Sequence, residues 1–297
     1  MEQRFSARNQ EKEVQVGMIR LPIPDYSLEA FREAVNNAVQ HRDYTRRGPV
    51  FVQFHPDRLF IANIGGFLEG ITLENILVHE PKPRNPLLTE SLRRIGLVET
   101  TARGIDKIYL GQLLYGRPVP DYTQSDSDNV RLNLRGKDAS LPFAAFVFEQ
   151  DKEGRNLTLD ELLALNHLQH ERRAEAQIIG NLTQQGESHG RAVLERLVER
   201  GLVEGRGERP RAYHLSASLY RRLGTPSGYV RTHGFDAIQQ EAMVLQFVHA
   251  HGRITRREAA ELCSLSSSQA SRLLRKLAKD SKVKATGIQR GSYYERI

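Results

Sequence analysis

Cysteine, tryptophan and long hydrophobic runs are scarce or absent in this chain of 297 residues. With a single cysteine, Cys263, no disulfide can form within the chain, and a zinc site built from several thiolates is excluded. Its neighbours Ala259, Ala260 and Leu262 lie at helical spacing, which is typical of a core thiol. No apolar run approaches the ~20 residues of a membrane span, and the polar start does not resemble a secretory signal. We therefore expect a cytoplasmic protein with no membrane partner.

The chain also lacks the Gly-x-x-x-x-Gly-Lys-Ser/Thr loop with which many nucleotide-driven motors hold phosphates. The string Arg135-Gly-Lys-Asp has neither the upstream glycine nor the hydroxyl residue of that loop. A translocating helicase needs this loop and a partner lobe, so no helicase motor is expected.

Charge is unevenly distributed. The formal net charge is +7, yet residues 1–150 carry about none of it, and most of the excess follows Gly252. A neutral N-terminal half and a basic C-terminal region predict a folded module joined to a region that binds an anionic partner. A basic surface that is merely solvated is the alternative.

The stretch Phe31–Tyr44 places Glu33 and Asn37 four residues apart on one predicted helix. At this spacing both side chains leave the same helix face, while Val35, Ala38 and Val39 are expected to face a core. A glutamate can activate a water, and an amide oxygen can ligate Mg²⁺, so the pair suits a nucleotide-hydrolysing site. A surface glutamate and a capping asparagine are the plainer interpretation.

A predicted hairpin follows this helix. Residues 51–54 alternate as a strand does, and residues 58–62 are predicted to be its partner. The second strand runs into Asn63, Gly65 and Gly66, where two glycines allow backbone to approach a ligand closely.

These motifs, taken in order, resemble the ATPase-like domain of bacterial and archaeal transcriptional regulators known as RecG-like C-terminal proteins. That family is similar in fold to the gyrase/Hsp90/histidine-kinase/MutL ATPases, a two-layer α/β sandwich. The resemblance covers about residues 22–150. The motifs that carry it are Arg-Glu-Ala…Asn-Ala…His-Arg-Asp-Tyr (32–44), Asn-x-Gly-Gly (63–66), Arg-Asn-Pro (84–86) and Glu…Gly-Ile (99–105).

The resemblance implies ATP or ADP with Mg²⁺ as the ligand, Glu33 as the base and Asn37 as the metal ligand. Asn63 stands where those ATPases usually place an aspartate that reads the adenine amino group, and Ala102 stands where glycine is more common. These departures leave open an ATP-hydrolysing enzyme, a regulator that only binds nucleotide, and a scaffold that binds none. The implied nucleotide contacts are Asn37, Asp43, Asn63, Gly65, Gly66, Arg103 and Gly104.

The C-terminal residues 236–297 follow the order helix, helix-turn-helix and basic hairpin, which predicts a winged helix-turn-helix. Thr255 and Glu258 form a capping-box pattern at the start of the second helix. The third predicted helix, 267–279, has small polar residues at its start and long basic ones further along, which suits the major groove of double-stranded DNA. A protein contact is the alternative. The DNA-binding candidates are Arg256, Ser267, Ser268, Gln269, Arg272, Arg275, Lys276 and Arg290.

Residues 157–224 repeat this plan, with Glu187, Glu195 and Glu199 on their third helix. We expect this copy to be the weaker DNA reader, with packing or homodimer formation as its alternative role. The predicted fold is α+β, a sandwich of the gyrase/Hsp90/histidine-kinase ATPase type followed by two winged helix-turn-helix domains. The predicted parts are an arm (1–21), the ATPase-like domain (22–150), the first winged helix (157–224), a linker (225–235) and the second winged helix (236–297).

The leading functional hypothesis is a DNA-binding transcriptional regulator with a nucleotide-binding N-terminal domain. Members of the resembling family often carry a further domain ahead of the ATPase-like one, whereas about twenty residues precede it here. We therefore expect a fragment or a shortened member.

Overall fold

The computed structural model has a mixed α+β fold in two compact units, Met1–Gly224 and Thr225–Ile297. It describes residues 1–16, 18–98, 104–137, 139–206, 211–223, 237–263, 265, 267–286 and 293–295. Arg103, Arg290 and the predicted linker 225–235 lie outside the described residues. Among the residues that are described, no helix is both long and apolar enough to cross a bilayer.

A three-stranded antiparallel sheet forms one layer of the first unit. Its strands are β3 (Phe51–Phe54), β4 (Arg58–Ile64) and β5 (Asn129–Arg135), and β4 lies in the middle. The predicted hairpin of residues 51–62 is therefore confirmed. Leu59 pairs with Leu134 and Ile61 with Leu132, which puts apolar side chains of neighbouring strands together in the core.

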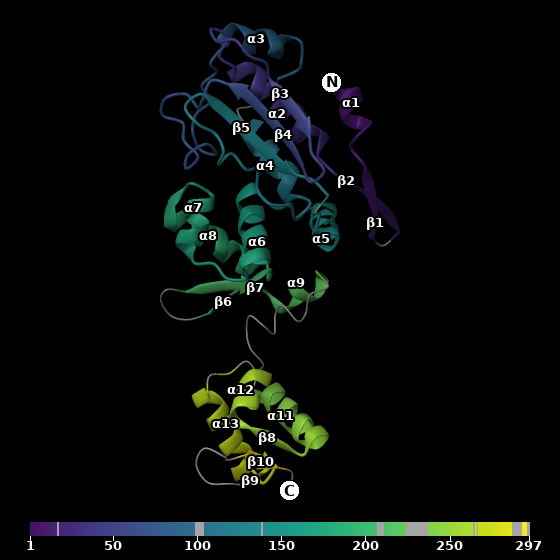
Figure 1. Cartoon of the computed structure of the whole chain (residues 1–297), viewed down its shortest axis with the longest axis vertical. Helices are drawn as coiled ribbons and strands as arrows, with labels where there is room; N and C mark the ends of the chain where they lie inside the picture. Colours follow the sequence, from purple (N-terminus) through teal and green to yellow (C-terminus); the bar gives the residue numbers. More distant parts are fainter. Residues whose placement is uncertain are drawn as a thin grey trace. The chain divides into compact units, whose positions relative to one another are not determined.

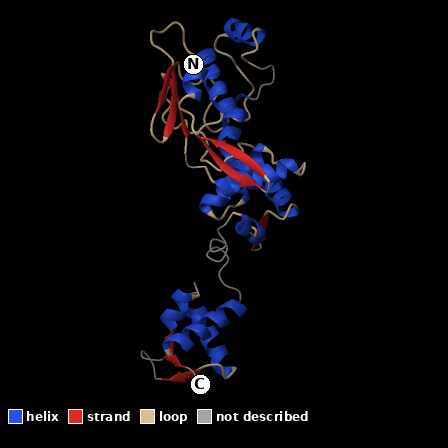
Figure 2. Cartoon of the chain, turned by 90° about the vertical axis from the view of Figure 1, so that its right-hand side faces the viewer, coloured by secondary structure: helices blue, strands red, loops and turns tan. Residues whose placement is uncertain are grey.

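Two helices, α2 (Leu28–His41) and α4 (Gly104–Leu113), form the other layer (Figures 1 and 2). The helix α2 begins where the Ser27 hydroxyl accepts a hydrogen bond from the Ala30 amide. It approaches α4 closely because Gly111 has no Cβ, which would lie 2.4 Å from the Ala30 Cβ.

Of the three residues expected to face a core, Ala38 is buried, whereas Val35 and Val39 are only half-buried. The buried face of α2 consists of Ala30, Phe31, Ala34, Ala38 and Gln40. The small residues Ala30, Ala34 and Ala38 lie four apart on one face of the helix, which suits close packing against α4.

The N-terminal residues belong to the first unit. Strands β1 (Glu11–Val16) and β2 (Ile19–Pro24) form an antiparallel hairpin. The short helix α1 (Glu2–Ser6) buries Phe5, whose ring stacks on Phe31 of α2 at 4.1 Å between centroids. The long connection between β4 and α4 contains α3 (Pro86–Arg94), none of whose residues is buried.

The rest of the first unit is mainly helical. Thr158 and Glu161 form a capping box at the start of its central helix α6. Asn166 of α6 donates a hydrogen bond to the Arg117 carbonyl at 2.9 Å, which connects this part to the segment that follows α4. Its elements are α5 (Leu141–Lys152), α6 (Leu159–Glu171), α7 (Ala176–Leu182), α8 (Gly186–Glu199), β6 (Val203–Arg206), β7 (Ala212–Leu215) and α9 (Ala217–Arg222).

The second unit has its own core, in which Cys263 is buried as expected. The capping box predicted for Thr255 and Glu258 is present, with the Thr255 amide 2.7 Å from the Glu258 carboxylate. The sheet order is β8-β10-β9. The elements are α11 (Ala237–His251), β8 (Arg253–Thr255), α12 (Arg256–Leu262), α13 (Ser267–Lys279), β9 (Lys284–Thr286) and β10 (Tyr293–Glu295).

Candidate functional site

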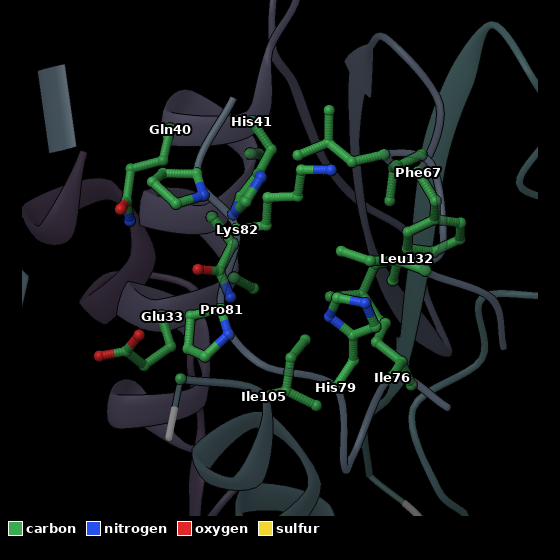
Figure 3. Close-up of a pocket in the computed structure, with 18 of the residues that line it drawn as sticks. Glu33, Gln40, His41, Phe67, Ile76, His79, Pro81, Lys82, Ile105 and Leu132 are labelled. Carbon is green, nitrogen blue, oxygen red and sulfur yellow. The ribbon is translucent and has the colours of Figure 1, made fainter. Parts of the chain in front are cut away.

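A cavity of about 380 Å³ lies in the first unit between α2, the sheet and the connection that contains α3. Figure 3 shows Glu33, Gln40 and His41 of α2 on one side of it, with Phe67, Ile76 and Leu132 on the other. Its walls are largely apolar, with a few polar groups among them, which is the usual character of a small-molecule site.

Glu33, Asn37 and Gly104 meet at one end of this cavity. A Cβ on Gly104 would lie 2.8 Å from Glu33 Oε2 and 3.5 Å from Asn37 Nδ2, so a side chain at this position would crowd Glu33 and touch Asn37 at an ordinary contact distance. Gly104 is also the first residue of α4, and the amides of a first helical turn attract anions. A carboxylate, an amide and a helix N-terminus therefore lie together here. The spacing of Glu33 and Asn37 predicted that these two side chains share a cleft, but it did not predict the helix N-terminus.

Lys107 is a neighbour of Glu33 that the sequence did not indicate. Its ammonium lies 4.0 Å from Glu33 Oε1 and 3.1 Å from Glu29 Oε1, and its side chain is 18% exposed. One turn of α4 separates Lys107 from Gly104. The backbone of α4 therefore lies close to Glu33 at Gly104, and the same helix places the positive charge of Lys107 near the Glu33 carboxylate. No local pattern connects residues that come together only when α2 packs on α4.

Asn63 is buried at the end of β4 and lines the cavity. Its amide nitrogen donates to the carbonyl oxygens of Ile64 at 3.2 Å and Gly65 at 3.3 Å. Both amide hydrogens are therefore used by backbone, and the oxygen Oδ1 is the group that Asn63 has to offer as an acceptor.

The predicted glycine turn is present, but its amides are already bonded. Gly65 has φ +95° and donates to the Asp128 carbonyl at 2.7 Å, and Gly66 donates to the Ser127 carbonyl at 3.2 Å. A Cβ on Gly66 would lie 2.5 Å from the Asp126 carbonyl oxygen. These glycines thus allow the loop 126–129 to pack closely, and Gly66 lines the cavity without an amide hydrogen to donate.

Asp43 does not line the cavity. Its carboxylate accepts hydrogen bonds from the Thr45 amide at 3.0 Å and the Thr45 hydroxyl at 2.7 Å, and these bonds lower the pKa of Asp43. Its backbone amide donates to the Ile64 carbonyl, so Asp43 joins the end of α2 to the end of β4. This is a structural contact beside the cavity.

Several polar cavity residues have no sequence signature. Burial, and next the nearby Arg84 guanidinium, lower the pKa of His41, which favours its neutral form. Burial strongly raises the pKa of Tyr122. The Thr89 hydroxyl is buried at the wall and has no hydrogen-bond partner within the described part of the chain. A polar ligand would satisfy this hydroxyl.

A second candidate surface lies on α13. Its buried stripe is Ala270, Leu273, Leu274 and Leu277, as predicted. Arg272 and Arg275 are exposed and make no ion pair with any other described residue, whereas Lys276 lies 2.5 Å from Glu241 of α11. The remaining predicted contacts that the structure describes are also exposed: Arg256, Ser267, Ser268 and Gln269.

Metal ligands of the usual side-chain types are not gathered anywhere in the described ranges. No group of three or more His, Cys, Asp or Glu residues among them could hold a metal ion. A cation at the cavity would thus need oxygens from its ligand, as Mg²⁺ at phosphates commonly has.

Comparison with known proteins identifies the middle of the first unit. Residues 48–134 match the model of the family described as "Putative ATP-dependent DNA helicase recG C-terminal". No curated protein matches the chain. The crystal structure of the DIP2311 protein from Corynebacterium diphtheriae is similar, with a TM-score of 0.62 and 22% sequence identity. The match covers 100% of this chain and 53% of that one, so the present chain spans about half its length. An ATPase-like domain family is therefore indicated for residues 48–134.

Proposed function

We propose that the chain is a DNA-binding transcriptional regulator whose first unit binds ATP or ADP with Mg²⁺. The observation that carries the nucleotide part is the convergence of Glu33, Asn37 and Gly104 at one end of the cavity. Asn37 Oδ1 would ligate the cation, and the first turn of α4 would meet the phosphates. When bound, Mg²⁺ neutralises phosphate charge and orients the phosphoryl group.

Asn63 supports adenine as the base. Because its amide nitrogen is bonded to Ile64 and Gly65, Asn63 would present Oδ1, an acceptor for the adenine amino group. The carbonyl oxygen that guanine has at this position would face another acceptor. The proposal therefore predicts ADP in preference to GDP, although the usual aspartate is replaced.

Nucleotide binding is tested by thermal unfolding of the full chain. With ADP and Mg²⁺ far above the dissociation constant, the midpoint of the first unit should rise by roughly 5 °C, because only the folded state binds the ligand. Asn37→Ala should remove this rise. The matched control is Asn36→Ala, whose amide bonds the Leu97 carbonyl, and it should keep the rise. No rise at millimolar ADP would favour a scaffold that binds no nucleotide.

The DNA part of the proposal is supported by the exposed face of α13 and by the element order of the second unit, α11-β8-α12-α13-β9-β10, which is the order expected of a winged helix-turn-helix. Arg272 and Arg275 would contact phosphates or guanine edges. Fluorescence titration with duplex DNA at several salt concentrations tests this. Affinity should fall steeply with salt, because each phosphate contact releases counterions. Binding that is absent or insensitive to salt would contradict the proposal.

ATP hydrolysis is a second candidate function, favoured by the placement of Glu33 beside Gly104. Glu33 would act on a water, with Lys107 holding the carboxylate in place. We expect slow phosphate release at most. Brisk release that Glu33→Ala abolishes, with nucleotide binding retained, would place the ATPase ahead of the nucleotide-binding regulator.

A further inference from the structure

Gln184 has a left-handed backbone at the turn between α7 and α8. Its φ is +60°, a region that residues other than glycine adopt rarely and at a cost in free energy. It lies two residues before α8 begins at Gly186. Its side-chain contacts explain why a glutamine stands there.

The Gln184 amide is bonded twice to one distant segment. Its oxygen Oε1 accepts from the Leu77 amide at 2.7 Å, and its nitrogen Nε2 donates to the Leu73 carbonyl at 2.7 Å. The side chain therefore uses its donor and its acceptor on the same piece of backbone, in the manner of a strand partner. Both bonds are half-buried, so water competes with them only partly.

That piece of backbone, residues 70–79, is a turn held by its own hydrogen bonds; we call it the 70–79 turn. The Asn75 side chain donates to the Gly70 carbonyl at 2.8 Å and accepts from the Thr72 amide at 2.8 Å. The other side of the 70–79 turn is part of the cavity wall, where Ile71, Ile76, Leu77 and His79 line the cavity. The turn thus touches the candidate ligand site on one side and Gln184 on the other.

We propose that Gln184 is a positioning residue that couples the 70–79 turn, and with it the ligand cavity, to the α7–α8 turn. The coupling to a ligand rests on the proposed function, in which the ligand is a nucleotide. A ligand that fixes the cavity wall fixes the Gln184 contacts, and these fix the start of α8. By thermodynamic linkage, a partner that holds α8 favours the same state of the cavity.

Hydrogen exchange of the full chain without ligand tests the contact. Gln184→Gly removes the side chain and tolerates the positive φ. We expect exchange in residues 70–79 to become roughly tenfold faster, because hydrogen bonds to the turn are lost. The control is Gln185→Ala, whose amide bonds Asp160, and it should leave this exchange unchanged. Unchanged exchange in Gln184→Gly would overturn the proposal.

A double-mutant cycle tests the transmission, again without ligand. Asn75→Ala loosens the 70–79 turn, and it should speed exchange at residues 183–186 when Gln184 is present but not in the Gln184→Gly background. An equal effect in both backgrounds would overturn the coupling.

Addition of ADP and Mg²⁺ then tests the regulatory consequence. The wild type should gain protection in residues 70–79 and 183–186, and Gln184→Gly only in residues 70–79. Equal protection of residues 183–186 in the variant would contradict the coupling. If ADP protects neither segment, the proposed nucleotide function fails, while the ligand-free cycle still decides the role of Gln184.

Discussion

The helices α8 and α13 occupy the same place in two similar orders of elements, yet their surfaces differ. On α8, Glu187 lies 2.7 Å from Arg191, and Glu195 lies 3.3 Å from Arg211 and accepts from the Tyr213 hydroxyl at 2.8 Å. These acidic groups are paired within the first unit. On α13 the arginines stand exposed and make no ion pair with any other described residue.

The buried sides of the two helices are alike. Val193, Leu194 and Leu197 fill the core beneath α8, and Leu274 and Leu277 do so beneath α13. Exposed charges contribute little to stability. Two helices with similar buried sides can therefore differ in surface charge, with paired acidic groups on α8 and unpaired arginines among the described residues of α13. Under the proposed function the DNA contacts are assigned to α13, whereas Glu187 and Glu195 of α8 pair with arginines of the first unit.

The largest expected effect tests whether the two cores are independent. Leu274→Ala should destabilise the second unit by about 2–5 kcal/mol, and Leu194→Ala should destabilise the first unit by a similar amount, because each removes a fully buried side chain. Calorimetry should show that the midpoint temperature of only one unfolding transition is lowered in each variant. A single variant that lowers both transitions would mean that the units unfold together.

The next effect tests the surfaces. Arg272→Ala and Arg275→Ala should each weaken binding of duplex DNA by about 1–3 kcal/mol if the guanidinium reads a base edge. The matched variant on α8 is Arg191→Ala, which should leave DNA affinity unchanged because Arg191 is paired with Glu187. Equal losses from both helices would remove the distinction between them.

Local patterns explain what the sequence could predict. The hairpin of β3 and β4, the capping box of Thr255 and Glu258 and the buried stripe of α13 depend on residues a few positions apart. The shared cavity of Glu33 and Asn37 also follows from one helical turn. Each of these patterns is set by the period of a helix or strand.

Tertiary packing decided the features that the sequence did not reveal. Phe5 is stacked on Phe31, and Lys107 is brought to Glu33, only after separate segments fold together. Gly65 and Gly66 were expected to let backbone approach a ligand, but their amides donate to carbonyls of the loop 126–129. Sequence spacing could not show which partner a backbone group would find.

A smaller effect concerns two cations that are already paired, Lys276 of α13 and Lys282 just after this helix. Glu241 lies 2.5 Å from Lys276 and 3.0 Å from Lys282. Glu241→Gln should free both ammonium groups and make the logarithmic salt dependence of DNA binding steeper by about one to two units. On α8, Glu187→Gln should free Arg191 without any such change. An unchanged slope for Glu241→Gln would mean that Lys276 and Lys282 point away from the DNA.

The smallest effect separates the units by pH. The pKa of His41 is lowered by burial and then by Arg84, so the unfolded chain binds a proton at a higher pH than the folded first unit does. The contribution of neutral His41 to the free energy of unfolding is therefore fully present above the ordinary pKa of 6.5 and is lost as the pH falls below that value. Between pH 7.5 and 5.5 the first unit should become less stable, and His41→Gln should reduce this dependence. In the second unit the pKa of Glu241 is lowered by Lys276 and Lys282, so that carboxylate titrates below the range. Chemical unfolding at each pH measures how the free energy of unfolding of each unit changes with pH. If this change in the first unit were the same in the wild type and in His41→Gln, the pH dependence would belong to another group.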